Sequence, residues 1–207
     1  MRRTELPAVS FVTVSVLLLF LGVMTMAQPS MPAKLEKATF AGGCFWCMQP
    51  SFNEFRGVVS TKVGYTGGHR VNPTYDDVCT GTTGHAEGIE ILYDPAKVTY
   101  AELVEEFWHN IDPTSLNQQF ADHGTQYRSA IFYHNDEQKR IAEASKEKLA
   151  KSGKFKKPIV TEIVPASTFY SAEDYHQDYY KKNAMHYKAY KVGSGRQSFI
   201  ENTWGKK

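Results

Sequence analysis

Apolar and polar residues follow one another along the chain in a pattern that predicts alternating strands and helices. Strands are expected over residues 38–43, 58–65, 88–93, 129–134 and 159–164, where short apolar runs end at glycine, proline or polar residues. Helices are expected over 44–55, 100–110, 135–152 and 172–183, the last of them rich in tyrosine and histidine. Residues 66–75 are expected to form a long loop, and the tail from Lys191 to be irregular. This alternation predicts one layered α/β or α+β domain.

The amino terminus differs from the rest of the chain because residues 9–26 are largely apolar and carry no charge. Arg2 and Arg3 precede this run, and the small residues Thr25 and Ala27 suit a cleavage site. We therefore expect a secretory signal over residues 1–27 and a protein exported to the periplasm or outside the cell. An uncleaved membrane anchor is the alternative, since the run is close to spanning length. Two prolines mark residues 28–34 as a linker before a domain over 35–207.

Composition excludes one class of partner. Twenty-four basic and 22 acidic residues leave a formal net charge of +2, without the cationic stripe that follows a nucleic-acid backbone. The densest basic stretch, residues 151–157, is expected to be a solvated loop. Nucleic acid is therefore not an expected ligand.

The most informative motif is the run 42–47, in which Cys44 and Cys47 follow a glycine pair. Cys44 falls at the first turn of a predicted helix, where unpaired N–H groups and the helix dipole favour a thiolate. Its alternative is a small buried hydrophobe. Cys47 lies one turn later on the same face, so it either attacks an oxidised Cys44 or stays inert. Phe45 and Trp46 either wall a pocket or pack in the core. Cys79 stands apart and is expected to be a structural thiol.

A second candidate is Glu87, which sits where the segment 84–88 enters an apolar strand. A carboxyl group in a poorly solvated cleft keeps its proton, because desolvation raises its pKa. Such an acid can donate a proton to a substrate oxygen while a thiolate attacks the atom that bears it. The alternative is a solvated charge at a strand edge.

Five segments, in this order, resemble the peptide methionine sulfoxide reductase A family. The likeness covers about residues 36–204, and the segments 172–177 and 193–195 also resemble the family. The five segments are Gly43-Cys-Phe-Trp46, Gly64-Tyr-Thr-Gly-Gly68, Asn72-Pro-Thr-Tyr75, Gly84-His-Ala-Glu87 and Asp122-His-Gly-Thr-Gln-Tyr-Arg128.

The resemblance implies an enzyme that reduces methionine (S)-sulfoxide, free or in proteins, and so repairs oxidised proteins. By the same resemblance Cys44 is the nucleophile, Glu87 the proton donor, and Tyr75 and Tyr127 the donors to the sulfoxide oxygen. Phe45 and Trp46 hold the substrate methyl group, and Asp122 lines the pocket. The fold implied is α+β, a two-layer sandwich with a ferredoxin-like core, added helices and long loops. No metal or organic cofactor is expected. The protein is expected to be a monomer and to use an external thioredoxin-like protein or dithiol as reductant.

Two positions depart from the commonest family pattern. Many members have glycine after Gly-Cys-Phe-Trp and carry resolving cysteines in a C-terminal tail, whereas this chain has Cys47 and no cysteine after Cys79. It is similar to the subgroup with Gly-Cys-Phe-Trp-Cys, in which Cys47 becomes the resolving residue through a Cys44–Cys47 disulfide. Gln49 replaces a familiar glutamate and is expected to alter the polarity of the pocket.

Two rival functions fit parts of the pattern. Cys44-x-x-Cys47 at a helix start is also typical of a thioredoxin-like disulfide oxidoreductase. A non-enzymatic, exported metal-binding module is the other, with zinc held by Cys44, Cys47, Cys79 and His85.

Overall fold

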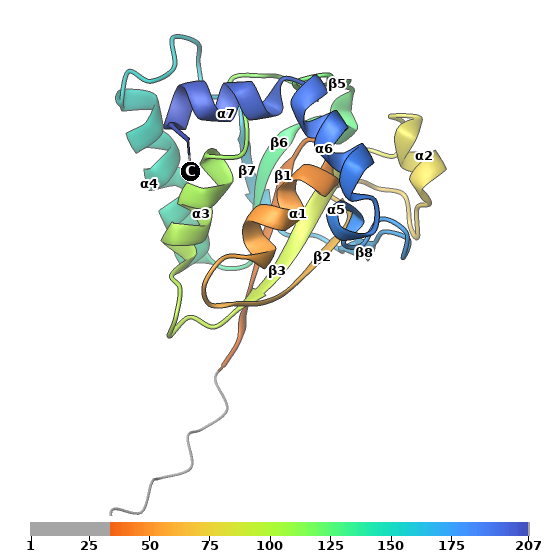
Figure 1. The fold of residues 1–207 in the computed structure, drawn as a ribbon. Helices are drawn as coiled ribbons and strands as arrows, with labels where there is room; N and C mark the ends of the chain where they lie inside the picture. Colours follow the sequence, from red (N-terminus) through yellow and green to blue (C-terminus); the bar gives the residue numbers. More distant parts are fainter. Residues whose placement is uncertain (1–33, 207) are drawn as a thin grey trace, which may run out of the picture. The chain divides into compact units, whose positions relative to one another are not determined.

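A computed structural model describes residues 34–206 (Figure 1). The predicted signal segment 1–27 and almost all of the predicted linker lie outside the described residues. Within 34–206, no helix combines the length and the apolar character needed to cross a membrane.

The centre of the domain is a split β-α-β arrangement of the ferredoxin-like kind. The chain runs in order through β1 (Glu36–Gly42), α1 (Phe45–Asn53), β2 (Val58–Thr66), β3 (Ala86–Tyr93), α3 (Tyr100–Trp108) and β6 (Ser129–Tyr133). In the sheet these strands lie in the order β6-β1-β3-β2, and every neighbouring pair is antiparallel. The expected α+β fold with a ferredoxin-like core is therefore confirmed.

Short elements extend this core at both edges of the sheet. β7 (Glu162–Pro165) pairs parallel with β6 after α4 (Asp136–Lys151), and β8 (Tyr170–Ser171) pairs antiparallel with β2. Between β2 and β3 lies the five-residue helix α2 (Tyr75–Cys79), which begins at the last residue of the stretch expected to be a loop. Between α3 and β6 lie the two-residue strands β4 (Gln118–Gln119) and β5 (Asp122–His123) and the 3-10 turn η1 (Thr125–Tyr127).

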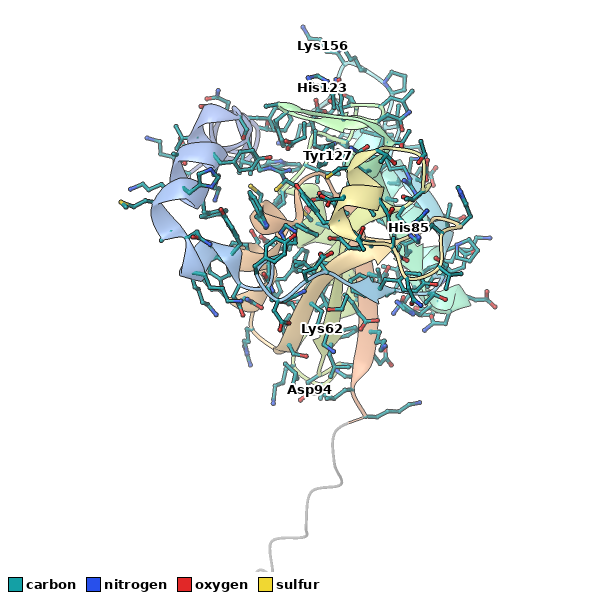
Figure 2. All side chains as sticks on the ribbon, turned by 90° about the vertical axis from the view of Figure 1, so that its right-hand side faces the viewer. Lys62, His85, Asp94, His123, Tyr127 and Lys156 are labelled. Carbon is teal, nitrogen blue, oxygen red and sulfur yellow. The ribbon has the colours of Figure 1, made fainter. Side chains whose placement is uncertain are left out.

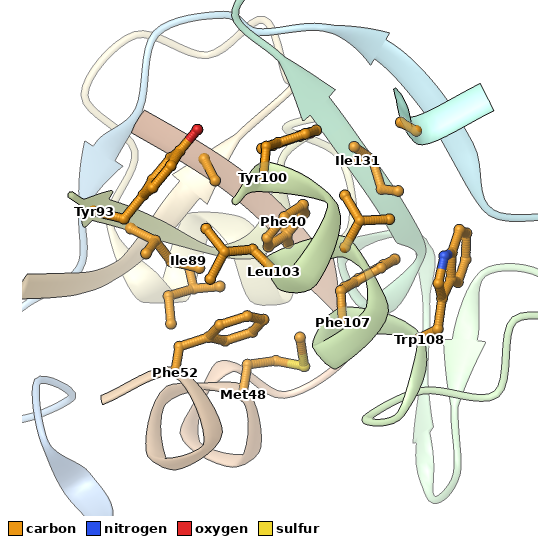
Figure 3. Close-up of a cluster of buried hydrophobic side chains, with 14 of the residues drawn as sticks. Phe40, Met48, Phe52, Ile89, Tyr93, Tyr100, Leu103, Phe107, Trp108 and Ile131 are labelled. Atoms are coloured by element: carbon orange, nitrogen blue, oxygen red, sulfur yellow. The ribbon is translucent and has the colours of Figure 1, made fainter. Parts of the chain in front are cut away.

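The main hydrophobic core lies between one face of the sheet and the helices α1 and α3 (Figure 3). Phe40, Ile89 and Ile131 project from three strands toward Phe52 of α1 and Phe107 of α3, and all five side chains are fully buried. Side chains alternate between the two faces of a strand. Residue 87 of β3 is therefore on the same face as Ile89 and Ile91, the face that α1 covers.

The last quarter of the described chain differs from the prediction. Of residues 172–183, only α5 (Tyr179–Lys182) is helical. The tail expected to be irregular forms α6 (Ala184–Gly193) and α7 (Arg196–Trp204) instead. Gly195, at φ 83°, is the N-cap of α7, so the segment 193–195 separates two helices. The prediction failed because neither helix carries a wide apolar stripe, and the glycines looked like part of a loop.

Candidate active site

A cavity of about 200 Å³ lies at the N-terminal end of α1. It is smaller than the roughly 300–1,000 Å³ of typical small-molecule pockets, so it suits a single side chain rather than an organic cofactor. Residues far apart in the sequence meet here, from the start of α1 and from α2, β3, β5, η1 and α6. The lining residues are Cys44, Phe45, Trp46, Tyr75, Glu87, Asp122, Tyr127 and Tyr190. The first seven were all expected from the sequence, whereas Tyr190 was not.

A tight turn between β1 and α1 places Cys44. Gly43 has φ 77°, and a Cβ atom there would come within 2.4 Å of the Gln119 side chain, so only glycine fits. Cys44 is the N-cap residue of α1 and is 7% exposed, on the wall of the cavity. The helix therefore starts with a sulfur atom facing the space that a substrate would occupy.

The protonation of Cys44 differs from the sequence-based expectation. The N–H of Phe45, the first donor of the helix, bonds to Glu87 Oε2 at 3.1 Å, and Cys44 makes no side-chain capping bond. Burial raises the pKa of the Cys44 thiol well above its ordinary value; its hydrogen bond to Cys47 and the charge of Glu87 act in the same direction. The expected stabilisation of a Cys44 thiolate by the helix end is therefore outweighed in the free enzyme, chiefly by burial of the thiol.

Glu87 lies under the start of α1, at the beginning of β3. It pairs with Tyr65 of β2 in the sheet, and its side chain is 2% exposed. Burial raises its pKa to about 8, against the opposing effect of the hydrogen bond from Phe45 N–H. At neutral pH Glu87 is therefore mainly a neutral carboxylic acid, as its position in the sequence suggested.

Two phenol groups line the cavity, one from α2 and one from η1. Tyr75 begins α2, and its backbone N–H donates to Glu173 Oε1 at 2.9 Å. Tyr127 ends η1; Figure 2 shows it beside α2 and far along the sheet from Asp94, which follows β3. Burial raises the pKa of both phenols above the ordinary value, so both remain hydrogen-bond donors at physiological pH.

Asp122 and Tyr190 form a hydrogen-bonded pair on the remaining wall. The Tyr190 hydroxyl donates to Asp122 Oδ2. Burial raises the pKa of Asp122, while the Tyr190 bond and the charge of Arg196 oppose this shift. Tyr190 lies on α6, outside every motif singled out in the sequence, and no periodicity there could have identified it.

Phe45 and Trp46 form an aromatic wall that is held from behind. Trp46 stacks on Tyr179, with ring centres 3.8 Å apart and planes 6° apart. Its indole N–H donates to His176 Nδ1 at 3.0 Å, and His176 also lies 5.1 Å from the Phe45 ring centre. His176 is 1% exposed and burial lowers its pKa, so it is the neutral tautomer with the proton on Nε2.

The other two cysteines occupy different surroundings. Cys47 lies behind Cys44 on the first turn of α1, is 2% exposed, and does not line the cavity. The hydrogen bond from Cys44 lowers the pKa of Cys47 to about 7, and the charges of Arg196 and Lys191 add to this effect. Cys79 is exposed at the end of α2, and its side chain shares a hydrogen bond with Tyr75.

Gln49 lies away from the cavity, contrary to the expectation that it changes pocket polarity. It is 1% exposed, its amide N–H donates to Thr61 Oγ1 at 3.2 Å, and its oxygen accepts the N–H of Asp178 at 2.8 Å. Gln49 thus joins α1 to β2 and to the turn before α5.

The proposed zinc set is not assembled. His85 accepts the N–H of Gly68 at Nδ1 and donates from Nε2 to the Arg70 carbonyl, so both ring nitrogens hold the loop before Tyr75. Cys79 is exposed on α2, whereas Cys44 and Cys47 are buried. Across residues 34–206, no three His, Cys, Asp or Glu side chains form a group suited to a metal ion. The four residues predicted as zinc ligands therefore do not form a zinc site in the described structure.

Comparisons with known proteins agree with this geometry. The model of the peptide methionine sulfoxide reductase family matches residues 36–207. A peptide methionine sulfoxide reductase MsrA of Bacillus pumilus is 58% identical over 86% of this chain and 99% of its own length. One from Listeria monocytogenes is 60% identical over 82% of this chain and 96% of its own length.

Solved structures give the same result. Methionine sulfoxide reductase A of Corynebacterium diphtheriae superposes with a TM-score of 0.66 at 41% identity, over 75% of this chain and 77% of its own. Reduced Mxr1 from Saccharomyces cerevisiae gives 0.68 at 37% identity, over 74% and 88%. The thioredoxin-like alternative is therefore wrong: the chain belongs to the peptide methionine sulfoxide reductase A family and is a peptide-methionine (S)-S-oxide reductase, which uses thiols to repair oxidised methionine.

Proposed function

We propose that Cys44 is the nucleophile of this reductase and Glu87 its proton donor. One observation carries this assignment: the cavity wall places the Cys44 sulfur beside a carboxyl group that is 2% exposed and mainly protonated at neutral pH. Cys47 does not line the cavity, so it does not meet the substrate first.

The cavity walls suggest how a methionine sulfoxide side chain would bind. Its methyl group packs on Phe45 and Trp46, the apolar part of the lining. Its oxygen points toward the hydroxyls of Tyr75 and Tyr127, which remain donors. Asp122, held by Tyr190, completes the polar side.

In the first step the Cys44 sulfur attacks the sulfoxide sulfur, and the sulfoxide oxygen is transferred to Cys44. The S–O bond of the substrate breaks, a Cys44 S–O bond forms, the substrate sulfur is reduced, and the cysteine becomes a sulfenic acid. Glu87 donates its proton to the oxygen, and the proton of the Cys44 thiol then reprotonates the Glu87 carboxylate. Because burial raises the pKa of both groups, the free site holds both protons until a sulfoxide accepts one.

In the second step Cys47 attacks the sulfur of the Cys44 sulfenic acid, releasing water and leaving a disulfide. A thioredoxin-like protein or another dithiol then reduces this bond by thiol exchange. Cys44 and Cys47 lie one helical turn apart in α1, which supports local disulfide formation. The scheme uses no metal or organic cofactor.

The protein is further proposed to act as an exported monomer, with residues 1–27 as its signal or, if uncleaved, its anchor. The apolar run 9–26 after Arg2 and Arg3 supports export. The N-terminal sequence of the mature protein and its mass by light scattering would test both statements.

Two cysteine variants test the catalytic scheme. Cys44→Ser is expected to abolish methionine formation. Cys47→Ser is expected to give about one methionine per enzyme with a thioredoxin-type reductant, since step one needs only Cys44. Mass spectrometry after one turnover of the wild type should show a Cys44–Cys47 bond. Multiple turnovers by Cys47→Ser under that reductant would refute the resolving role.

A further inference from the structure

Arg196 is a buried cation without an anionic contact. It begins α7 and is 1% exposed. Its guanidinium donates to the carbonyls of Gly42 at 2.9 Å and Asn110 at 2.7 Å, lies 3.9 Å from Met48 Sδ, and stacks 4.7 Å from the Phe120 ring centre. In the described part of the chain, none of these partners carries a charge. Burying a charge without an anionic partner lowers the stability of the protein, which suggests that Arg196 has a functional role.

The guanidinium lies against both ends of the segment that carries the two thiols. Gly42 precedes Cys44 by two residues, and Met48 directly follows Cys47. A Cβ atom at Gly43 would lie 2.8 Å from Arg196 Nη2, which shows how closely the group approaches the turn. Arg196, which does not line the cavity, therefore supports the Cys44–Cys47 segment at both of its ends.

We propose that Arg196 is the positioning residue of the resolving step: it supplies the buried positive charge that stabilises the Cys47 thiolate as this attacks Cys44, and it fixes the turn that aims Cys44. This inference rests on the proposed function, in which Cys47 resolves the sulfenic acid.

The chemistry of the resolving step shows which charge Arg196 would stabilise. Cys47 loses its proton, and its sulfur attacks the sulfur of the Cys44 sulfenic acid. An S–S bond forms and the S–O bond breaks; the Cys47 sulfur is oxidised, the Cys44 sulfur is reduced, and the departing hydroxide takes up a proton to become water. Negative charge thus appears on Cys47 inside the protein, where a nearby buried cation acts more strongly than it would in water.

The other groups around Cys47 do not replace Arg196. Lys191 acts in the same direction, but its effect on Cys47 is smaller than that of Arg196. Asp122 opposes both cations. The titratable and charged groups that face Cys47 besides Arg196 are Cys44, Glu87, Asp122, Tyr187, Tyr190 and Lys191.

The test separates the two steps of one turnover in the full-length protein. Methionine formation reports the first step, and loss of a dimedone-reactive sulfenic acid reports the second. Arg196→Met and Arg196→Gln remove the charge, Arg196→Lys keeps it, and Arg140→Met is the matched control on the exposed face of α4.

The charge-removing variants are expected to slow the second step about five-fold or more at pH 7 and to shift its pH profile upward, because a rise of one unit from a pKa of about 7 lowers the thiolate fraction from about one half to about one tenth. Methionine formation should change less, Arg196→Lys should retain most of the wild-type profile, and Arg140→Met should change nothing. Equal slowing of both steps, an unshifted profile, or unfolding of both charge-removing variants would overturn the inference. Absence of methionine formation in the wild type would instead overturn the proposed function.

Discussion

Replacing Glu87 by glutamine should make the protein more stable while it impairs catalysis. The folded pKa of about 8 lies well above the ordinary 4.5 of a glutamate. Between these values the unfolded chain has lost the proton that the folded chain keeps. The free energy of unfolding of the wild type therefore falls as pH rises, by about 1.4 kcal/mol per pH unit.

The size of this effect follows from the pH range between the ordinary and the folded pKa of Glu87. From pH 4.5 to 7 the Glu87 contribution lowers the free energy of unfolding by about 3 kcal/mol, and the loss counted from pH 4.5 levels off above pH 8 at about 4 kcal/mol. Glutamine cannot ionise, and its side-chain oxygen can still accept the N–H of Phe45. The difference in stability between Glu87→Gln and the wild type should consequently grow with pH over this range.

Urea denaturation of both proteins at several pH values between 4.5 and 8.5 measures this difference. The Cys44→Ser background removes the titration of the neighbouring nucleophile. In the active background, Glu87→Gln should slow methionine formation roughly 10²- to 10⁴-fold, the usual contribution of a general acid. A stability difference that stays constant with pH would show that Glu87 is ionised in the folded protein, and the proposed proton transfer would lose its donor.

Two further substitutions probe the walls of the cavity. His176→Phe removes the acceptor of the Trp46 indole N–H, so kcat/KM should fall roughly 5- to 30-fold, mainly through a higher KM, because a hydrogen bond of about 1–2 kcal/mol to a binding residue is lost. Steady-state kinetics with a methionine sulfoxide peptide would decide, and an unchanged KM would count against the role of His176. Tyr190→Phe removes the hydroxyl that lowers the pKa of Asp122. If Asp122 contributes as a carboxylate, the acid side of the pH profile for methionine formation should move upward. A profile that does not move would exclude this coupling.

The sequence predicted the first two thirds of the domain well because its strands are short apolar runs between turn residues and its helices have one apolar face. Phe40 and Ile89 lie in such runs, and Phe107 lies on the apolar face of its helix, so the local pattern reveals each element. The same argument placed Cys44 at a helix start and Glu87 at the edge of a strand. Tyr75, Tyr127 and Asp122 came only through the family resemblance, since nothing in their local pattern points to a shared cavity.

The C-terminal segment could not be read in this way. His176 and Tyr190 are fixed by contacts with Trp46 and Asp122, more than 65 residues away in the chain. Arg196 looks like an ordinary surface cation after a glycine-rich break, and its burial depends on carbonyls from β1 and from the end of α3. Such tertiary contacts leave no periodic signal in the sequence.

The bond between Arg196 and the carbonyl of Gly42 spans 154 residues, from the beginning of the domain almost to its end. A ribosome therefore completes both cysteines long before the guanidinium and the Tyr190 wall exist. Contacts so distant in sequence form late in folding, since closing the intervening chain costs entropy. In the newly made polypeptide Cys44 and Cys47 are consequently exposed to oxidants at first. They become buried only when α7, the last helix, packs against the rest of the domain.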